Sequence, residues 1–246
     1  MPASEGFAQS LPRLGLYLAS WAKGWRTCLE NGVIPAANLR FDSNAVTIAA
    51  SLPIPDIAHE TMFTVDEKSI LVAKIPEVLS AEECQSLIAK IDDIGPEVAP
   101  INTSHGTRVR TDVRNNERVM FDDVDLAEKV FHKAEPHVPA EMRSRRLVGA
   151  NERFRCYRYK SGMRFAPHAD GSFERENDKS YYTFLIYLND DFTGGETNMA
   201  TQPELSIRPE VGLGLVFQHP IVHEGAEVTS GIKYVARTDL MYRKES

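Results

Sequence analysis

Residues 153–159 read Arg-Phe-Arg-Cys-Tyr-Arg-Tyr, and residues 233–242 read Lys-Tyr-Val-Ala-Arg-Thr-Asp-Leu-Met-Tyr. Both runs are rich in aromatic and β-branched residues, which favour a pleated, half-buried strand. Similar short runs continue from Arg145 to the C-terminus. The turn signals between them are Ser161-Gly162, Gly194-Gly195, Gly212 and Ser230-Gly231. Several short strands at this spacing predict a β-barrel or sandwich.

Two helical patterns precede these strands. Ser80 and Glu83 form a capping-box pattern ahead of apolar residues at helical spacing. These are Cys84, Leu87, Ile88 and Ile91. The second amphipathic pattern, which ends before Pro136, consists of Val124, Ala127, Val130, Phe131 and Ala134. This order along the chain, with helices before strands, predicts an α+β, mainly β fold in which N-terminal helices buttress a barrel.

The N-terminal 60 residues have a different character. One predicted helix, which ends at Asn31-Gly32, has its apolar face at Leu14, Leu18, Trp21, Trp25 and Cys28. Residues 51–60 contain two prolines and are typical of a linker. We therefore expect an N-terminal helical extension and linker at residues 1–60, followed by one domain at residues 61–246.

Composition restricts the partners and the compartment. Of the 246 residues 42% are hydrophobic, which is enough for a core, and the formal net charge of -7 argues against nucleic acid as a partner. No apolar run approaches the ~20 residues of a membrane span. Cys28, Cys84 and Cys156 are far apart and odd in number, which predicts reduced thiols in a cytoplasmic protein. The oligomeric state stays open.

A metal site is predicted by three residues. His168 and Asp170 are two positions apart, so on an extended strand both side chains point from the same face. His223 follows two predicted strands later, a separation that a folded-back barrel closes. Two imidazoles and one carboxylate form the facial triad of non-haem Fe(II) oxygenases. His219, four residues earlier on the same strand face, is the competing ligand, and we favour His223.

A cation follows the distal histidine by ten positions. A dicarboxylate that chelates iron at one end needs a cation for its other carboxylate, and Lys233 would supply it. Lys233, Val235, Arg237 and Asp239 share one face of the predicted strand. Arg237 is therefore a second candidate for the same role, and exposed strand cations are the alternative for both.

A substrate region is suggested by the alternating run at 153–159. Arg153, Arg155, Tyr157 and Tyr159 share a face, and cations that point into a barrel are costly unless they meet an anion. We expect Arg153 or Arg155, with Tyr157 beside them, to bind a substrate carboxylate or phosphate; pairing with an internal Asp or Glu is an equal alternative. The polar run Arg114-Asn-Asn-Glu-Arg118 is expected to be a solvated loop, with a lid over the site as the alternative.

The second half of the chain contains a set of motifs: Tyr159-x8-His-x-Asp170, Tyr187-Leu-Asn189, Gly194-Gly-Glu-Thr197, and His223-Glu-Gly225 with Lys233. As a set they resemble the prolyl 4-hydroxylase-like branch of the 2-oxoglutarate/Fe(II) dioxygenases. The resemblance covers about residues 71–243, with specific motifs from residue 151 onward. It implies a double-stranded β-helix, a jelly-roll barrel flanked by helices.

The same resemblance implies cofactors and residue roles. The cofactors are Fe(II), 2-oxoglutarate as cosubstrate and O2, with ascorbate as a further candidate. Lys233 would pair with the distal carboxylate of 2-oxoglutarate, and Tyr187 and Tyr159 would donate hydrogen bonds to it; simple packing of these tyrosines in the core is the alternative.

Hydroxylation is the activity that the resemblance implies. Asp170 favours it, because related halogenases have a small residue at this position. The expected substrate is an amino acid, a peptidyl residue such as proline or a similar small molecule, with release of succinate and CO2. The alternatives are a cupin-like metalloenzyme that does not use 2-oxoglutarate, which leaves Lys233 without a role, and a non-catalytic metal-binding barrel.

Overall fold

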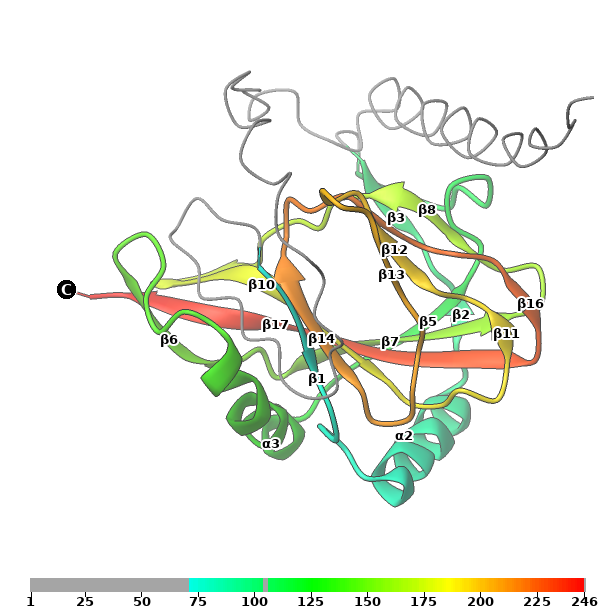
Figure 1. Ribbon diagram of the computed structural model, residues 1–246, viewed down its shortest axis with the longest axis horizontal. Coiled ribbons are helices and arrows are strands. Elements are labelled where there is room, and N and C mark those ends of the chain that lie inside the picture. The colour runs from blue at the N-terminus through cyan, green and yellow to red at the C-terminus, as the bar shows by residue number, and fades with distance from the viewer. Residues whose placement is uncertain (1–70, 104–105, 246) are drawn as a thin grey trace, which may run out of the picture.

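The computed structural model describes residues 71–103 and 106–245 (Figure 1). The helical elements are α2 (Ala81–Ile94), α3 (Val124–Ala134) and the 3-10 turn η2 (Glu135–His137). The strands before α3 are β1 (Val72–Ile75), β2 (Glu97–Val98), β3 (Ile101–Thr103), β4 (Gly106–Arg108) and β5 (Glu117–Asp122). The helix and linker expected within residues 1–60 lie outside the described residues.

The strands after α3 make up most of the barrel. They are β6 (Arg145–Ala150), β7 (Arg153–Lys160), β8 (Phe165–His168), β9 (Glu174–Arg175), β10 (Asp178–Tyr187), β11 (Thr193–Gly194), β12 (Thr197–Met199), β13 (Leu205–Ile207), β14 (Gly214–Gln218), β15 (His223–Gly225), β16 (Val228–Ser230) and β17 (Ile232–Lys244). The expected succession of short strands from Arg145 onward is confirmed.

Two antiparallel sheets form the jelly roll. The major sheet has the strand order β1-β14-β10-β17-β7-β5-β2, with β6 beside β17 and β9 beside β10, and the minor sheet has the order β13-β12-β15-β8. Strands distant in sequence thus become neighbours: β17 lies between β10 and β7. The expected double-stranded β-helix, mainly β with N-terminal helices, is confirmed.

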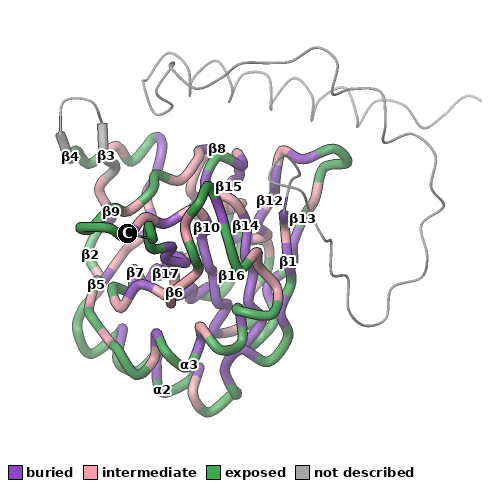
Figure 2. The backbone as a smooth tube through the Cα atoms, turned by 90° about the vertical axis from the view of Figure 1, so that its left-hand side faces the viewer, coloured by how far each residue is buried: buried purple, intermediate pink, exposed green. Residues whose placement is uncertain are grey.

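The two faces of the major sheet bury different sets of side chains. Along β7, Phe154 and Cys156 join the core on the side of the helices, whereas Tyr157 and Tyr159 join a second core inside the barrel. This follows from the two-residue period of a strand. Figure 1 shows α2 and α3 on the same side of this sheet. Figure 2 shows both helices at one end of the molecule and buried stretches along the strands above them.

The helices begin and end as the sequence predicts. At the start of α2 the Ser80 hydroxyl accepts from the Glu83 amide and the Glu83 carboxylate accepts from the Ser80 amide, which is a complete capping box. α3 ends before the predicted Pro136, which lies in η2. Within residues 71–103 and 106–245 no helix is both long and apolar enough to cross a membrane.

The expected solvated loop at residues 114–118 is wrong. Arg114 and Asn116 are buried, and Glu117 begins β5, which pairs with β7. Glu117 forms ion pairs with Arg158 and Lys160 of β7, so the polar run ends in a strand that charges hold across the sheet. The polar composition of this run suggested exposure to solvent, because the sequence of one segment does not show its pairing with another strand.

Candidate metal centre

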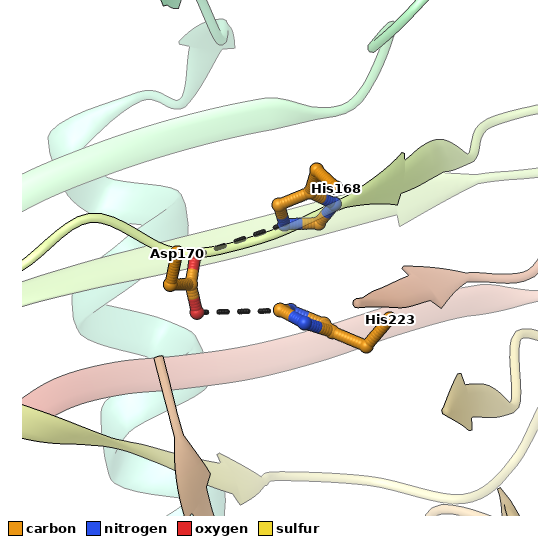
Figure 3. A group of neighbouring side chains, drawn as sticks. All are labelled: His168, Asp170 and His223. Atoms are coloured by element: carbon orange, nitrogen blue, oxygen red, sulfur yellow. Dashed lines mark ion pairs between the residues drawn. The ribbon is translucent and has the colours of Figure 1, made fainter. Parts of the chain in front are cut away.

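The three predicted metal ligands come together inside the barrel. His168 is the last residue of β8 and His223 the first of β15, and the two are paired across these antiparallel strands. Asp170 follows β8 by two residues. One ligand atom from each residue lies within 4.8 Å of the others. The three side chains point toward one another (Figure 3), with Nε2 of His168 and of His223 at 3.7 and 3.6 Å from the two Asp170 oxygens.

Both histidines present a metal-binding nitrogen. Nδ1 of His168 lies 2.9 Å from the carbonyl of Ala166, and Nδ1 of His223 lies 2.9 Å from the carbonyl of Ile221. A carbonyl only accepts, so Nδ1 carries the proton and Nε2 offers its lone pair. Burial lowers the pKa of both rings, which keeps them neutral.

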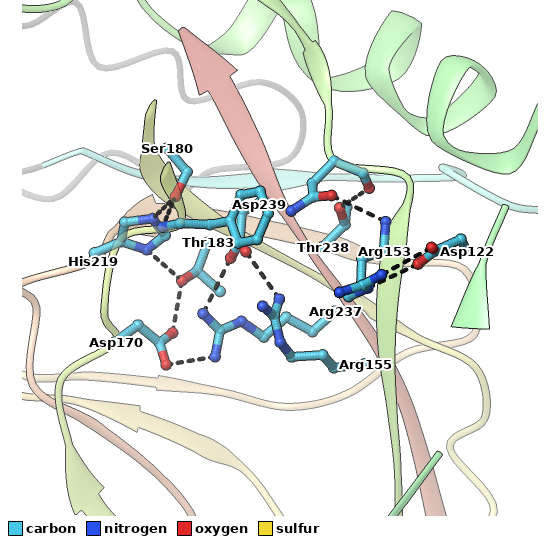
Figure 4. Close-up of polar contacts among 12 residues, drawn as sticks. Asp122, Arg153, Arg155, Asp170, Ser180, Thr183, His219, Arg237, Thr238 and Asp239 are labelled. Atoms are coloured by element: carbon cyan, nitrogen blue, oxygen red, sulfur yellow. Dashed lines mark hydrogen bonds and ion pairs between the residues drawn. The ribbon is translucent and has the colours of Figure 1, made fainter. Parts of the chain in front are cut away.

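Asp170 is held at both oxygens. The Thr183 hydroxyl donates to Oδ2 at 2.6 Å, and Arg237 Nη1 donates to Oδ1 at 2.6 Å (Figure 4). Burial alone would raise the pKa of this carboxyl, but the charge of Arg237 and the Thr183 hydrogen bond bring the pKa far below its usual range. Asp170 is therefore ionised, and each oxygen keeps a further lone pair for a metal.

His219, the competing ligand, supports Thr183. Its Nδ1 lies 2.9 Å from the Thr183 hydroxyl and its Nε2 lies 2.8 Å from the Ser180 hydroxyl (Figure 4). Because the Thr183 hydrogen is used on Asp170, the Thr183 oxygen accepts from Nδ1–H, and Nε2 accepts from Ser180. Nothing in the sequence marks Thr183, although its position on the inward face of β10 follows from the alternation with Leu185 and Tyr187.

Lys233 lines the same cavity and is buried. Its Nζ donates to the Gly195 carbonyl at 2.5 Å and lies 5.3 and 5.4 Å from the ring centres of Tyr159 and Tyr187. The Tyr187 hydroxyl donates to the Thr197 hydroxyl at 2.7 Å. Burial lowers the pKa of Lys233 to about 7, and in the described part of the chain no carboxylate forms an ion pair with it. A buried ammonium of this kind fits the free carboxylate of a bound dicarboxylate.

Not every predicted residue reaches the cavity. The cavity is lined by all the predicted site residues except Arg153 and Arg155. Arg153 is exposed and pairs with Asp122, and Arg155 pairs with Asp239 at 2.9 Å (Figure 4). Internal pairing, the alternative expected for these arginines, is thus what Arg155 shows. Arg237 is occupied by Asp170 and Asp239, which leaves Lys233 as the cation nearer to Tyr187.

Comparison with known proteins agrees with this geometry. Residues 154–238 match the family model of the 2OG-Fe(II) oxygenase superfamily, a segment that contains all three predicted ligands and Lys233. Residues 154–238 therefore form a 2OG-Fe(II) oxygenase domain. Comparison with the curated proteins found no match for the oxygenase. The cofactors of this family, Fe(II) and 2-oxoglutarate, fit the neutral histidine nitrogens, the ionised Asp170 and the buried Lys233.

Solved structures share the fold of the oxygenase. A viral collagen prolyl hydroxylase from Paramecium Bursaria Chlorella virus-1, in a 2OG complex, has 22% identity and a TM-score of 0.52, over 70% of this chain and 96% of that one. A Pseudomonas putida prolyl-4-hydroxylase has 17% identity and a TM-score of 0.50, over 71% and 93%. A Trichoplax adhaerens prolyl hydroxylase, in complex with a hypoxia inducible factor peptide fragment, has 15% identity and a TM-score of 0.53, over 70% and 83%. The oxygenase therefore has a prolyl 4-hydroxylase-like barrel.

Proposed function

We propose that this oxygenase hydroxylates an unactivated C–H bond of an amino acid, a peptidyl residue such as proline or a similar small molecule, and releases succinate and CO2. The observation that supports the proposal most is the presence of the His-Asp-His triad and the buried Lys233 in one cavity. A metal site alone would not need a desolvated cation beside it, since that cation is costly without an anion.

His168, Asp170 and His223 would hold Fe(II) through Nε2, a carboxylate oxygen and Nε2. Three protein ligands leave open positions, as in the facial triad, so there is room for 2-oxoglutarate and O2. The bound iron supplies the oxidation chemistry of the family. The side chains supply position: the carbonyls of Ala166 and Ile221 orient the two rings, and Thr183 and Arg237 fix the carboxylate.

Lys233 would pair with the distal carboxylate of 2-oxoglutarate. Binding of that anion would restore the charge that burial removes from the ammonium. Tyr187 and Tyr159, whose rings contact Lys233, would turn their hydroxyls to the same carboxylate. Arg237 stays on Asp170 in this arrangement, so its role is to hold a metal ligand.

The substrate class rests on the shared barrel and on general properties of the chain. The similar structures act on prolyl residues according to their descriptions, which supports a peptidyl or free amino acid substrate here. A cytoplasmic location is part of the proposal, because Cys84 and Cys156 are both free buried thiols.

The proposal is tested by succinate formation. Wild type would be incubated in air with Fe(II), 2-oxoglutarate and a panel of amino acids and proline-containing peptides, and succinate and hydroxylated product measured. We expect succinate from wild type and from His132→Ala, an exposed histidine of α3, but none from His168→Ala. Equal amounts of succinate in wild type and His168→Ala would refute the proposal.

A further inference from the structure

Four arginines gather on the side of the cavity formed by β5, β7 and β17. In the register of the major sheet Arg118 lies opposite Tyr157, and Arg237 lies opposite Arg155, so these side chains emerge on the barrel face. Arg114 precedes β5 and bridges to Phe165 of β8. Arg114, Arg118, Arg155 and Arg237 are called the inner arginine cluster below.

The inner arginine cluster is short of negative charge. Two of its members share carboxylates: Arg155 binds Asp239 at 2.9 Å, and Arg237 binds Asp239 at 3.1 Å and Asp170 at 2.6 Å. Asp170 is also the proposed iron ligand, so its charge is shared with the metal. Four guanidinium groups thus lie around two carboxylates.

Arg114 is buried without a carboxylate. It is 5% exposed, its Nε donates to the Asn116 side chain at 2.7 Å, and in the described part of the chain its Nη2 has no hydrogen-bond partner. A buried donor left unpaired costs about 1–3 kcal/mol, and more when it is charged. A ligand oxygen placed beside this atom would complete its hydrogen bonds.

Arg118 is the second cation without an anion. It is half-buried, and among the described residues no hydrogen bond or ion pair holds it. Burial lowers the pKa of Arg118, and so do the charges of Arg114, Arg155 and Arg237. These three arginines are close enough to repel Arg118, so the cluster is one electrostatic unit rather than four separate side chains.

The cluster is in contact with the metal centre through aromatic rings. The guanidinium of Arg114 lies 4.6 Å from the ring centre of Tyr157 and 4.3 Å from that of Phe165. The Phe165 ring in turn stacks on His168 with 3.5 Å between centroids. Tyr157, Phe165 and Arg237 all line the cavity. An anion bound at the cluster would therefore hold the rest of its molecule next to the iron site.

We infer that the inner arginine cluster binds an oxyanion, a carboxylate or phosphate, of the substrate. The inference rests on the proposed function and narrows its substrate class to molecules with a negatively charged group. Arg114 and Arg118 contribute the free N–H donors. The rings of Tyr157 and Phe165, which the Arg114 guanidinium contacts, shield the ion pair from water and so strengthen it. A neutral substrate would leave these donors unpaired.

The test measures binding of small anions to the loaded enzyme. Wild type saturated with Fe(II) and 2-oxoglutarate under anaerobic conditions would be titrated with benzoate, phenyl phosphate and the uncharged benzamide by calorimetry. We expect at least one anion to bind and benzamide not to bind. Whichever of benzoate and phenyl phosphate binds tighter identifies the carboxylate or the phosphate as the preferred group.

Variants assign the binding to the cluster. In Arg118→Gln we expect the anion affinity to fall at least about tenfold, because a charged hydrogen bond is lost, while Arg118→Lys keeps part of it. The control is Arg243→Gln, an exposed arginine near the end of β17 that pairs with Asp178. The visible absorption of the iron–2-oxoglutarate complex is recorded on each sample, and its presence in Arg118→Gln shows that the variant is folded.

Two results would overturn the inference. One is binding of benzamide equal to that of both anions in wild type, or no binding of either anion. The other is an anion affinity that is the same in wild type and Arg118→Gln. A missing absorption band in wild type would instead refute the proposed function, so the two failures are distinguished within the same experiment.

Discussion

Single residues around Asp170 hold the carboxylate that we propose as a metal ligand. Thr183 donates to Oδ2 and is itself held by His219. In Thr183→Val the shape is kept and the donor is lost, so we expect Fe(II) affinity to fall about 10–100-fold, as for other residues that orient metal ligands. Anaerobic Fe(II) titration measures this. Thr183→Ser should restore most of the affinity, and an unchanged affinity in Thr183→Val would show that the hydroxyl does not position Asp170.

Lys233 gives a pH-dependent prediction at the same scale. Burial lowers the pKa of Lys233 to about 7, so at pH 8 the empty enzyme has mostly a neutral amine, and pairing with a carboxylate would raise that pKa again. We expect 2-oxoglutarate binding at pH 8 to take up close to one proton. Calorimetry in buffers of different ionisation enthalpy measures the uptake. Lys233→Arg, which stays charged, should take up none, and equal uptake in both proteins would contradict the assignment.

The stability of the empty enzyme should follow the same pKa. The folded-state pKa of Lys233, about 7, lies below the unfolded value near 10.5, so the unfolded chain binds more protons between these pH values. The free energy of unfolding contributed by this group therefore increases as the pH rises from 7 toward 10. Urea unfolding should find Lys233→Met more stable than wild type at pH 6, with a smaller difference at pH 9. A difference that does not change with pH would contradict this.

The residues of the metal site differ in how far the sequence predicts them. The spacing of His168 and Asp170 on one strand is a weak signal by itself, and it gains weight from His223, which is followed ten positions later by Lys233. Thr183 and Arg114 carry no such signal, since their roles depend on partners from other strands. The sequence predicts Arg237 as a second candidate cation for the distal carboxylate, or as an exposed strand cation, whereas the structure shows its contact with Asp170.

Among the secondary-structure elements, the helices can be predicted from the sequence, because the residues that start them are close together in the chain. The α2 cap is formed within four residues, so its signal is complete in the sequence. The sequence does not reveal β5, because the partners of Glu117 are Arg158 and Lys160 of β7, which lie 41 and 43 residues further along the chain.

At the element scale, the α2 cap is testable. Ser80→Ala removes the acceptor for the Glu83 amide, and we expect the free energy of unfolding to decrease by about 1 kcal/mol. Urea denaturation measures it. Ser86→Ala, a hydroxyl on the exposed face of α2, serves as the control; an equal loss in the control would mean that the cap does not contribute specifically.

At the scale of the whole molecule, the major sheet separates the hydrophobic core under the helices from the candidate site inside the barrel. The side of the major sheet that faces α2 and α3 is a closed hydrophobic core, while the barrel side combines apolar residues with the metal centre. Phe154 is fully buried on the first side. We expect Phe154→Ala to cost about 3–5 kcal/mol in thermal or urea unfolding, while 2-oxoglutarate affinity at low temperature stays unchanged. Loss of affinity in folded Phe154→Ala would show that the two sides are coupled.

The central claim is that His168, Asp170, His223 and Lys233 form one site for Fe(II) and 2-oxoglutarate. The most direct test is an anaerobic titration of the apoenzyme with both, recorded by visible absorption. The account predicts a metal-to-ligand charge-transfer band in wild type, no band in His168→Ala, and a band that needs at least about tenfold more 2-oxoglutarate in Lys233→Met. No band in wild type, or the same titration in wild type and Lys233→Met, would contradict it.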